Sequence, residues 1–348
     1  MRVGFVFHKD PLLPPDGIDL VRLHALTAGL RRTGWDVEIL APVREPAVSE
    51  AGVRVRPIED MATGRYDLVK TCYHFSAELI GAFDGPVVSR LVRVVDERLP
   101  ERDARWRQDL LRCQRAVASR AAMVVFDDHE NERRWRAAYD TPAATLLVPT
   151  GCPAVLPAVG PDPYDRGERA VLFLGSICAP RMVAMLNALA GALRGAARIH
   201  HVGRGKLDLY GSESSAAPGA GLSPLIVPHG EVREERVWDY VRHARLGLAL
   251  APGPHLFDNG LAKIYTYLRG GLPVLSEERV ATNDLLAATG GGTVFAYGDV
   301  EEAVSTARVL LDRPPRAGAE QVMDFMAHEH CWERRVDRYA AAFTALLA

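Results

Sequence analysis

The sequence predicts an α/β protein with two doubly wound domains, each built on a parallel sheet. Short apolar strands alternate with helical stretches throughout the 348 residues, and this alternation is typical of parallel sheets with helices on both faces. The chain is long enough for two ordinary domains with separate cores. Residues 151–169 are rich in proline and glycine, which indicates a linker between the two halves.

The first half of the chain begins with a buried strand pattern at residues 3–7. A proline-rich loop over residues 11–17 follows, and the leucine spacing over residues 20–32 predicts an amphipathic helix. Gly34 is expected to end that helix. Further strands are expected at residues 37–40, 53–56, 68–69, 86–88 and 123–126, and charged helices at residues 96–120 and 130–139.

The second half repeats the alternation. Strands are expected at residues 170–174, 199–202, 225–227, 246–250, 274–275 and 293–295, with helices between them and a closing helix at 332–347. We therefore expect an N-terminal domain over residues 1–155 and a C-terminal domain over residues 168–328. The remaining segment, residues 329–348, is expected to pack back toward the N-terminal domain.

The composition is average for a soluble globular protein, with 48% hydrophobic and 25% charged residues. A net charge of −2 gives no reason to expect a nucleic-acid partner. The five cysteines are odd in number and lack C-x-x-C spacing, which argues against a disulfide framework and a zinc site. No apolar run approaches the ~20 residues of a transmembrane helix, and residues 3–7 are too short for a signal-peptide core. We expect a cytoplasmic protein.

Residues 257–276 carry the most informative pattern. Asp258, Asn259 and Gly260 form a polar loop that leads into a short helical pattern bearing Lys263. A loop that feeds a helix N-terminus presents free backbone N–H groups, which suit a phosphate, and a lysine there adds a point charge. The alternative for Lys263 is an ordinary exposed lysine; the surrounding pattern favours phosphate contact.

This segment resembles the donor-nucleotide motif of GT-B glycosyltransferases, in which an acidic loop precedes a K-x-x-E-Y helix and a G-x-P-V strand. Thr266 stands where that family usually has glutamate. Other pieces resemble further motifs of the sugar-nucleotide-dependent, family 4-like group, and they occur in the family's order. These pieces lie at residues 34–37, 147–151, 173–175, 201–205, 228–232 and 330–333.

The resemblance implies two Rossmann-like domains facing a central cleft, the GT-B fold. It also implies an enzyme that moves a sugar from a UDP- or GDP-linked donor to a hydroxyl of a small acceptor, with neither a metal nor a further cofactor. The C-terminal domain would hold the donor and the N-terminal domain the acceptor. Peripheral membrane contact through the arginine-rich residues 98–120 is possible in such enzymes, but the interleaved acidic residues favour an ordinary salt-bridged surface.

The resemblance also implies a set of donor residues. Gly175 would allow the diphosphate to approach the backbone closely. Arg181 would bind phosphate through its bidentate guanidinium group; the alternative is a solvated arginine at a helix start. Thr266 cannot offer the bidentate carboxylate that would bind the ribose. The expected donor site comprises Gly175, Ser176, Arg181, His229, Gly230, Asp258, Asn259, Gly260, Leu261, Ala262, Lys263 and Thr266.

The acceptor side is expected in loops of the N-terminal domain. Asp16 and Gly17 follow the first strand, and His74 follows the strand at residues 68–69, where it is a candidate proton handler or sugar ligand. Asp96 ends a segment that resembles the Y-R-x-x-D of bacterial glucuronosyltransferases, which makes it a candidate catalytic base. It is equally placed to cap the helix that follows, and Asp19 is expected to cap the helix at residues 20–32.

Two other functions share this architecture. A non-hydrolysing sugar-nucleotide epimerase would need acidic residues and histidines that converge on the sugar, and it would convert a sugar nucleotide without an acceptor. A degenerate, non-catalytic GT-B protein would bind a nucleotide sugar or a partner enzyme. Thr266 favours the degenerate protein, whereas the retained Asp258 and Lys263 favour the transferase. The stereochemical outcome, retention or inversion, stays open.

Overall fold

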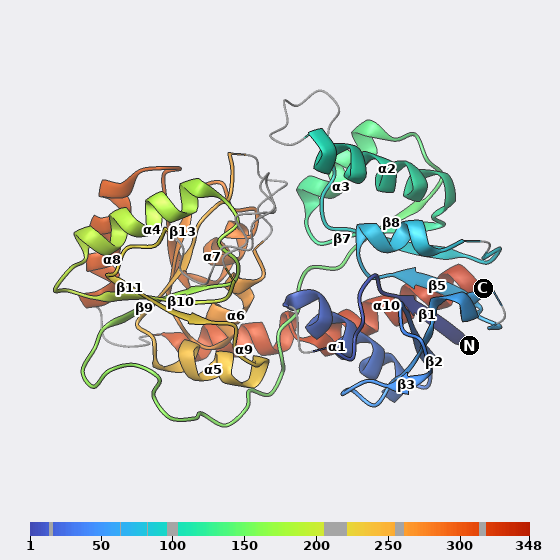
Figure 1. Cartoon of the computed structure of the whole chain (residues 1–348), viewed down its shortest axis with the longest axis horizontal. Coiled ribbons are helices and arrows are strands. Elements are labelled where there is room, and N and C mark those ends of the chain that lie inside the picture. Colours follow the sequence, from blue (N-terminus) through green and yellow to red (C-terminus); the bar gives the residue numbers. More distant parts are fainter. Residues whose placement is uncertain are drawn as a thin grey trace. The chain divides into compact units, whose positions relative to one another are not determined.

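The structure is a computed structural model of the whole chain. It describes residues 1–13, 17–62, 64–81, 83–95, 104–204, 221–254, 261–312 and 318–348. The chain divides into two compact units (Figure 1). Unit 1 comprises Met1–Gly151 together with Cys331–Ala348, and unit 2 comprises Cys152–His330. The last helix of the chain therefore belongs to the same unit as the first strand.

Unit 1 is built on an eight-stranded sheet in the order β3-β4-β2-β1-β5-β6-β7-β8. All pairs are parallel except β3 with β4, which is antiparallel. The strands are β1 (Arg2–Val6), β2 (Asp36–Ala41), β3 (Ala47–Val48), β4 (Arg54–Pro57), β5 (Leu68–Thr71), β6 (Val87–Leu91), β7 (Met123–Phe126) and β8 (Ala144–Leu147). Because the chain crosses from one side of β1 to the other, the sheet is doubly wound and changes direction between β1 and β5.

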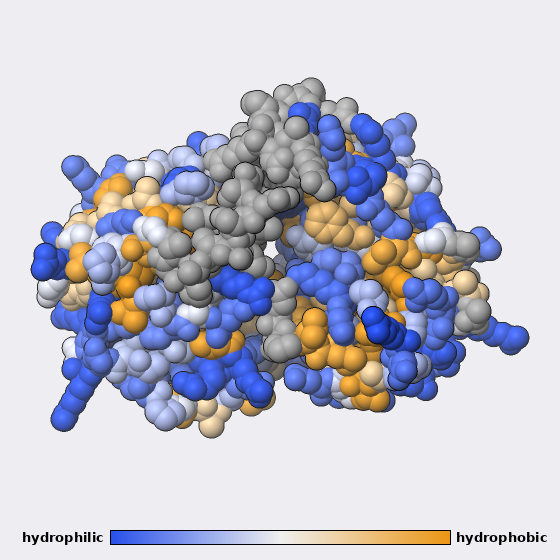
Figure 2. All heavy atoms as spheres, viewed as in Figure 1, coloured by the Kyte–Doolittle hydropathy of each residue, from blue (hydrophilic) through white to orange (hydrophobic). Residues whose placement is uncertain are grey.

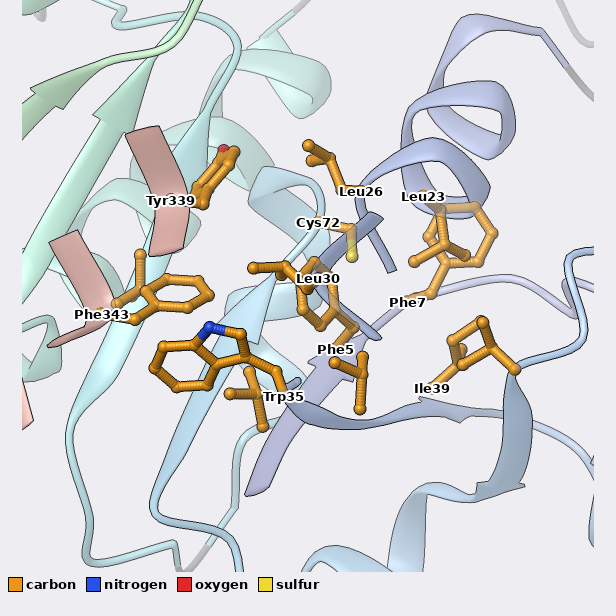
Figure 3. Packing of buried hydrophobic residues seen from close by; sticks show 14 of the residues in the cluster. Phe5, Phe7, Leu23, Leu26, Leu30, Trp35, Ile39, Cys72, Tyr339 and Phe343 are labelled. Atoms are coloured by element: carbon orange, nitrogen blue, oxygen red, sulfur yellow. The ribbon is translucent and has the colours of Figure 1, made fainter. Parts of the chain in front are cut away.

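Helices cover both faces of this sheet. They are α1 (Ile18–Arg32), η1 (Ile58–Met61), η2 (His74–Leu79), α2 (Ala104–Arg120), α3 (His129–Ala138) and α10 (Trp332–Leu347). One face packs against α1 and α10, where Phe5, Leu30 and Phe343 belong to a single apolar cluster (Figure 3). Within that cluster Trp35 meets Phe343 edge to face, with ring centroids 5.8 Å apart.

Unit 2 is built on a six-stranded parallel sheet in the order β11-β10-β9-β12-β13-β14. The strands are β9 (Ala170–Leu174), β10 (Arg198–Val202), β11 (Ile226–Gly230), β12 (Leu246–Ala249), β13 (Val274–Glu277) and β14 (Gly292–Phe295). This order is that of a Rossmann sheet, and its winding reverses between β9 and β12. Ligands of such sheets bind beyond the carboxyl ends of the strands at this reversal.

The helices of unit 2 also lie on both faces. They are α4 (Pro180–Ala192), α5 (Glu234–His243), α6 (Lys263–Arg269), α7 (Asn283–Thr289), α8 (Val300–Asp312) and α9 (Ala319–Glu329). Phe173 of β9 packs into the cluster that α4 and α8 share, while its neighbour Leu172 packs into the cluster on the side of α5 and α6. The predicted fold class, α/β with two doubly wound parallel sheets, is confirmed.

Several local expectations differ from the structure. The helix α1 begins at Ile18 with Gly17 as its N-cap residue, so the prediction that Asp19 caps this helix is wrong. Asp19 lies in the first turn, where its carboxylate pairs with Arg90 instead. The strands β3 and β8 were not expected: β3 has only two residues, and in β8 Ala144 is exposed while the other three residues are only partly buried. Residues 96–103 of the expected charged helix lie outside the described residues.

The surface is largely hydrophilic on the face seen in Figure 2, where hydrophobic residues form smaller groups between polar ones on both units. Scattered apolar side chains are normal on a protein surface. Within the described ranges, no helix is both long and apolar enough to cross a membrane.

The contact between α1 and α10 gives a stability prediction. A Cβ atom at Gly29 would overlap with the Val336 side chain of α10, so Gly29→Ala is expected to force the two helices apart. We expect a loss of about 1–3 kcal/mol in the free energy of unfolding, the usual cost of overpacking a core.

The matched control is Gly191→Ala, because Gly191 is also helical but nothing lies within 4 Å of its Cβ position. That change is expected to be neutral or stabilising by up to about 0.5 kcal/mol, since alanine is the better helix former. Urea denaturation measures both variants. A Gly29→Ala variant as stable as Gly191→Ala would contradict the close packing of α1 on α10.

Candidate functional site

The carboxyl edge of the unit 2 sheet is formed by tightly packed glycine loops. Gly175 follows β9 with a φ of 90°, and Gly230 ends β11 with a φ of 69°. The N–H of Gly175 donates to the carbonyl of Val202 at 2.8 Å, and the N–H of Gly203 donates to the carbonyl of Gly230 at 2.8 Å. A Cβ atom at Gly203 would overlap with the Gly175 backbone. Three loops therefore meet backbone to backbone beside the reversal of the winding.

Lys263 brings a positive charge to this edge. It is the first residue of α6, and its Nζ lies 3.7 Å from the centroid of the Phe173 ring. A Cβ atom at Gly175 would lie 3.7 Å from the Lys263 Cε, so the side chain passes beside this loop. Burial lowers the pKa of Lys263 to about 7. Among the residues that the structure describes, no carboxylate forms an ion pair with its ammonium group, so the lysine can accept an anion.

Arg181 lies near the start of α4 and holds a carboxylate that the sequence reasoning missed. Its guanidinium bonds both oxygens of Glu277, at 2.5 and 3.0 Å, and its Cζ lies 4.1 Å from the centroid of the Tyr297 ring. Burial lowers the pKa of Arg181, but the hydrogen bonds and charge of Glu277 outweigh this and raise it. The Glu277 side chain is fully buried.

Glu277 also organises backbone around it. Its carboxylate accepts hydrogen bonds from the N–H groups of Ala251 at 2.8 Å and Gly298 at 2.9 Å. Arg181 is therefore committed to a buried cluster and does not present an open fork. The sequence signal that could have revealed Glu277 is its position just after the apolar pair at residues 274–275, because a carboxylate at the end of a parallel strand faces the ligand edge.

Of the remaining residues predicted for the donor site, some lie in the part of the chain that the structure describes and others do not. Ser176 is partly buried after Gly175, and Ala262 is the N-cap residue of α6, just after Leu261. Thr266 lies within α6 and is partly exposed. Three predicted loop residues lie outside the described residues: Asp258, Asn259 and Gly260. The structure thus brings Gly175 and Lys263 together, and it gives no account of the acidic loop.

His229, another predicted donor residue, does not present its ring to the open edge. Its Nε2 lies 2.9 Å from Nδ1 of His200, and its Nδ1 lies 3.2 Å from the Tyr240 hydroxyl. Gly230, the next residue, has the positive φ noted above. The sequence reasoning missed His200 and Tyr240, because they come from β10 and α5 and only the fold brings them to His229.

In unit 1, the corresponding edge lies where the sheet changes direction between β1 and β5. Gly17 caps α1 with a φ of 77°. His74, the first residue of η2, is only 2% exposed, and its ring centroid lies 3.9 Å from Tyr73 and 4.2 Å from Phe75. Burial, with the charges of Arg93 and Arg90, holds the pKa of His74 well below its usual value. Its imidazole is therefore neutral and shielded. Asp16 and Asp96 lie outside the described residues.

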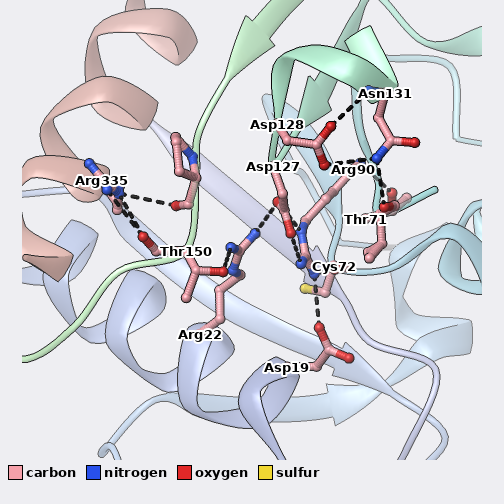
Figure 4. Close-up of polar contacts among 12 residues, drawn as sticks. Asp19, Arg22, Thr71, Cys72, Arg90, Asp127, Asp128, Asn131, Thr150 and Arg335 are labelled. Atoms are coloured by element: carbon pink, nitrogen blue, oxygen red, sulfur yellow. Dashed lines mark hydrogen bonds and ion pairs between the residues drawn. The ribbon is translucent and has the colours of Figure 1, made fainter. Parts of the chain in front are cut away.

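A buried ionic network lies at the same edge of unit 1 (Figure 4). Asp127, directly after β7, accepts hydrogen bonds from Arg22 of α1 at 2.6 Å and from Arg90 of β6 at 2.9 and 2.5 Å. Both arginines are 3% exposed. Burial raises the pKa of Asp127, but the two guanidinium groups overcome this and hold it well below its ordinary value.

The network extends to the surface and to the end of the unit. Arg90 Nη1 bonds the carboxylate of Asp19 at 2.9 Å, and Arg22 Nη2 bonds the hydroxyl of Thr150 at 3.0 Å. Arg335 of α10 bonds the carbonyl oxygens of Pro149 and Thr150 at 3.1 Å. The sequence reasoning missed this network. Charged residues in the middle of a buried strand and on an apolar helix face were the signals that could have revealed it.

No cluster of three or more histidine, cysteine or carboxylate side chains suited to a metal ion occurs in the described part of the chain. Instead, the arginines of the two edges form ion pairs with carboxylates, and Lys263 lies over an aromatic ring.

No protein-family model matches the sequence, and no curated protein matches it. Solved structures do. Sucrose-phosphate synthase from Thermosynechococcus elongatus superposes with a TM-score of 0.77 at 14% identity, covering 99% of this chain and 98% of the other. HepE from Anabaena, in complex with UDP-glucose, gives a TM-score of 0.78 at 12% identity, covering 99% and 100%. WaaG, a glycosyltransferase involved in lipopolysaccharide biosynthesis, gives 0.70 at 16% identity, covering 98% and 99%. At such identities the likeness shows the fold. This chain has the GT-B fold, with two Rossmann-like units.

Proposed function

We propose that the protein is a glycosyltransferase that moves a sugar from a nucleoside-diphosphate sugar to a hydroxyl group of a small acceptor. The observation that carries the proposal is Lys263, a partly buried lysine beside Gly175 at the edge where a Rossmann sheet binds its ligand. A structural neighbour, HepE, has been solved with UDP-glucose, which supports a nucleotide-sugar donor here.

We assign the donor diphosphate to the edge formed by Gly175 and Lys263. Gly175 is exposed and has no side chain, so a phosphate can approach its backbone closely. In the reaction the bond between the sugar C1 and the diphosphate oxygen breaks, and a bond from C1 to the acceptor oxygen forms. The ammonium of Lys263 would stabilise the negative charge that develops on the leaving diphosphate, a role that needs no metal ion.

The rest of the nucleotide would extend toward β11. Backbone groups of residues 228–230 are suited to the edge of the base, because the rings of His229 and its partners point elsewhere. Thr266 would offer the ribose a single hydroxyl in place of a carboxylate. We assign Arg181 the role of fixing Glu277, and through it the backbone of Ala251 and Gly298, beneath the sugar nucleotide.

We assign the acceptor to the loops of unit 1 that follow β1 and β5, with Asp16 and Gly17 as contacts. Asp96 is the proposed base that takes the proton of the acceptor hydroxyl. His74 was also a candidate for proton transfer. Its burial and neutral state favour a structural role instead, in which its ring packs against Tyr73 and Phe75. The surface-exposed part of Asp19 adds a carboxylate at this edge.

The test is a thermal-shift panel of UDP, GDP, ADP, CDP and dTDP. We expect one of them to stabilise the protein by about 2.7 kcal/mol at a concentration of a hundred times its Kd. The corresponding sugar nucleotide should then be consumed with EDTA present, but only when a hydroxyl acceptor is added. Stabilisation by none of the nucleotides would contradict the proposal. Conversion of the donor without an acceptor would point to an epimerase, and binding without turnover to a degenerate protein.

A further inference from the structure

A β-bulge ends the pairing of β10 with β11. Ile199 pairs with Ile226 and His201 with Pro228, but Val202 then pairs with Gly230. His229 is thus the extra residue of the bulge. Bulges redirect a side chain and are frequent beside active sites. Here the bulge turns the His229 ring toward α5, and Gly230 adopts the positive φ that glycine tolerates best.

The redirected ring completes a chain of four side chains, which we call the histidine relay: Glu168, His200, His229 and Tyr240. Tyr240 contacts Nδ1 of His229 at 3.2 Å, His229 Nε2 contacts Nδ1 of His200 at 2.9 Å, and Nε2 of His200 contacts the Glu168 carboxylate. The two imidazole rings lie nearly parallel, with an interplanar angle of 19°.

Chemistry fixes the direction of every hydrogen bond in the relay. A carboxylate only accepts, so His200 donates from Nε2, and its Nδ1 must accept when the ring is neutral. His229 then donates from Nε2 and accepts at Nδ1 from the Tyr240 hydroxyl. With both rings neutral, each proton has one acceptor. A proton added to either ring leaves every link in place only if the Tyr240 hydroxyl turns round, so that its oxygen accepts from Nδ1 of His229.

The surroundings keep both rings neutral. Burial lowers the pKa of His200 and of His229, although Glu168 acts in the opposite direction. Arg198 counteracts that carboxylate at the start of β10. Besides the relay's own members, the ionisable groups that interact with it are Asp165, Arg198, Tyr164 and His201.

The relay is coupled to the glycine loops through the backbone. The carbonyl of Gly230, directly after His229, accepts the N–H of Gly203 at 2.8 Å. Gly203 in turn packs against the Gly175 backbone so closely that no side chain fits between them. A shift of His229 therefore moves the loops against which the donor diphosphate is proposed to lie.

We propose that the histidine relay positions the nucleotide-binding edge of unit 2, with Glu168, His200 and Tyr240 as positioning residues for a nucleoside diphosphate. The inference rests on the proposed function. It adds side chains that do not touch the donor and that nevertheless set its affinity. Because burial lowers the pKa of both histidines from their usual value of about 6.5, both rings are neutral near neutral pH and the relay has the single set of donors given above.

The test compares Tyr240→Phe with Tyr164→Phe. Tyr164 is a matched control because it is also buried, lies edge to face with Tyr240 at 5.9 Å, and donates its hydroxyl to a backbone carbonyl, that of Tyr240, at 2.8 Å. Each variant loses one hydroxyl and one hydrogen bond, but only Tyr240→Phe cuts the relay. Calorimetry with UDP near neutral pH should show an affinity about fivefold weaker for Tyr240→Phe, the value of one hydrogen bond, and within about twofold of wild type for Tyr164→Phe.

The kinetic constants separate positioning from general destabilisation. In a turnover assay, Tyr240→Phe should raise KM for the donor and leave kcat unchanged, because the relay supports the donor edge and has no assigned contact with the reacting atoms. Tyr164→Phe should leave both constants within about twofold of wild type.

Imidazole ¹⁵N NMR of the free protein tests the relay without any nucleotide. Both His200 and His229 should be neutral Nε2–H tautomers near neutral pH; an Nδ1–H tautomer at His229 would overturn the relay. Equal UDP affinities and equal donor KM values for Tyr240→Phe and Tyr164→Phe would overturn its positioning role. If wild type binds none of the nucleotides of the panel, the proposed function fails and the positioning role fails with it, while the NMR result still decides whether the relay itself exists.

Discussion

Replacing Lys263 by methionine is expected to weaken nucleoside diphosphate binding by about tenfold to a hundredfold, because a hydrogen bond to a charged group contributes about 1.5–3 kcal/mol. The same change is expected to raise the melting temperature of the free protein. Methionine keeps the length of the side chain and its contact with Phe173, but it has no charge to bury. A gain in stability together with a loss of binding is the signature of a residue kept for its ligand.

The pH dependence follows from the pKa of Lys263, which burial lowers from 10.5 to about 7. Between these values the folded protein binds fewer protons than the unfolded chain, so the penalty of burying the ammonium is complete below pH 7 and disappears toward pH 10.5. The stability gained by Lys263→Met should therefore be largest in acid. Since the phosphate prefers the protonated lysine, wild-type affinity should fall as the pH rises above about 7.

The control is Arg169→Met, which also removes one positive charge from unit 2. Arg169 pairs with Asp312 at 3.0 Å on the surface, before the start of β9, and exposed pairs of this kind contribute little to stability. Calorimetry and thermal denaturation of both variants give the comparison. If Lys263→Met binds the selected nucleotide as tightly as Arg169→Met does, Lys263 does not contact the phosphate.

The second large effect is expected from Asp127→Asn. This change leaves the guanidinium groups of Arg22 and Arg90 buried without the carboxylate that neutralises them. Removing one partner of a buried ion pair costs about 3–5 kcal/mol, and we expect about 3 kcal/mol here because Asp19 still pairs with Arg90. Urea denaturation followed by tryptophan fluorescence measures it, with Trp135 in unit 1 and Trp238 in unit 2 as reporters.

A surface pair provides the comparison for Asp127. Asp109 bonds Arg112 at 2.8 Å with both side chains exposed to at least 36%, so Asp109→Asn should change stability by less than about 0.5 kcal/mol. Because the two arginines hold the pKa of Asp127 well below normal, its contribution is present above about pH 3.9 and is lost as the pH falls further. The stability of Asp127→Asn should therefore fall less steeply below about pH 3.9 than that of wild type. Equal stabilities of Asp127→Asn and Asp109→Asn would contradict the network.

All strands except β3 and β8 could be predicted from the sequence, because a strand buried on both faces is a short apolar run whatever surrounds it. The two exceptions lie at the edges of the first sheet and are largely exposed or only partly buried. Lys263 could be placed at a helix start because Gly260 and Gly270 frame a short pattern. Partners that depend on the tertiary fold could not be found in this way. Arg22 and Asp127 lie 105 residues apart, and His200 and His229 belong to different strands. Neither pair leaves a local pattern.

The histidine relay shows a second limit of prediction. A pattern can place His229 at a strand end, but a one-residue bulge decides which way its ring points. Likewise, Arg181 sits where a phosphate contact was expected, yet Glu277 from a strand 96 residues away takes its guanidinium. The chemistry of a side chain is thus visible in the sequence, while its availability is set by neighbours that only folding supplies.

The helix α10 has a consequence for how the chain is made. Ribosomes deliver residues in order, so the core of unit 1 waits for Tyr339 and Phe343 until all of Cys152–His330 has been synthesised. At ordinary elongation rates this delay is on the order of ten to thirty seconds. During it, unit 2 can complete its own sheet while the α10-facing side of the first sheet stays uncovered. The half of the molecule that is made first is therefore the half that finishes folding last.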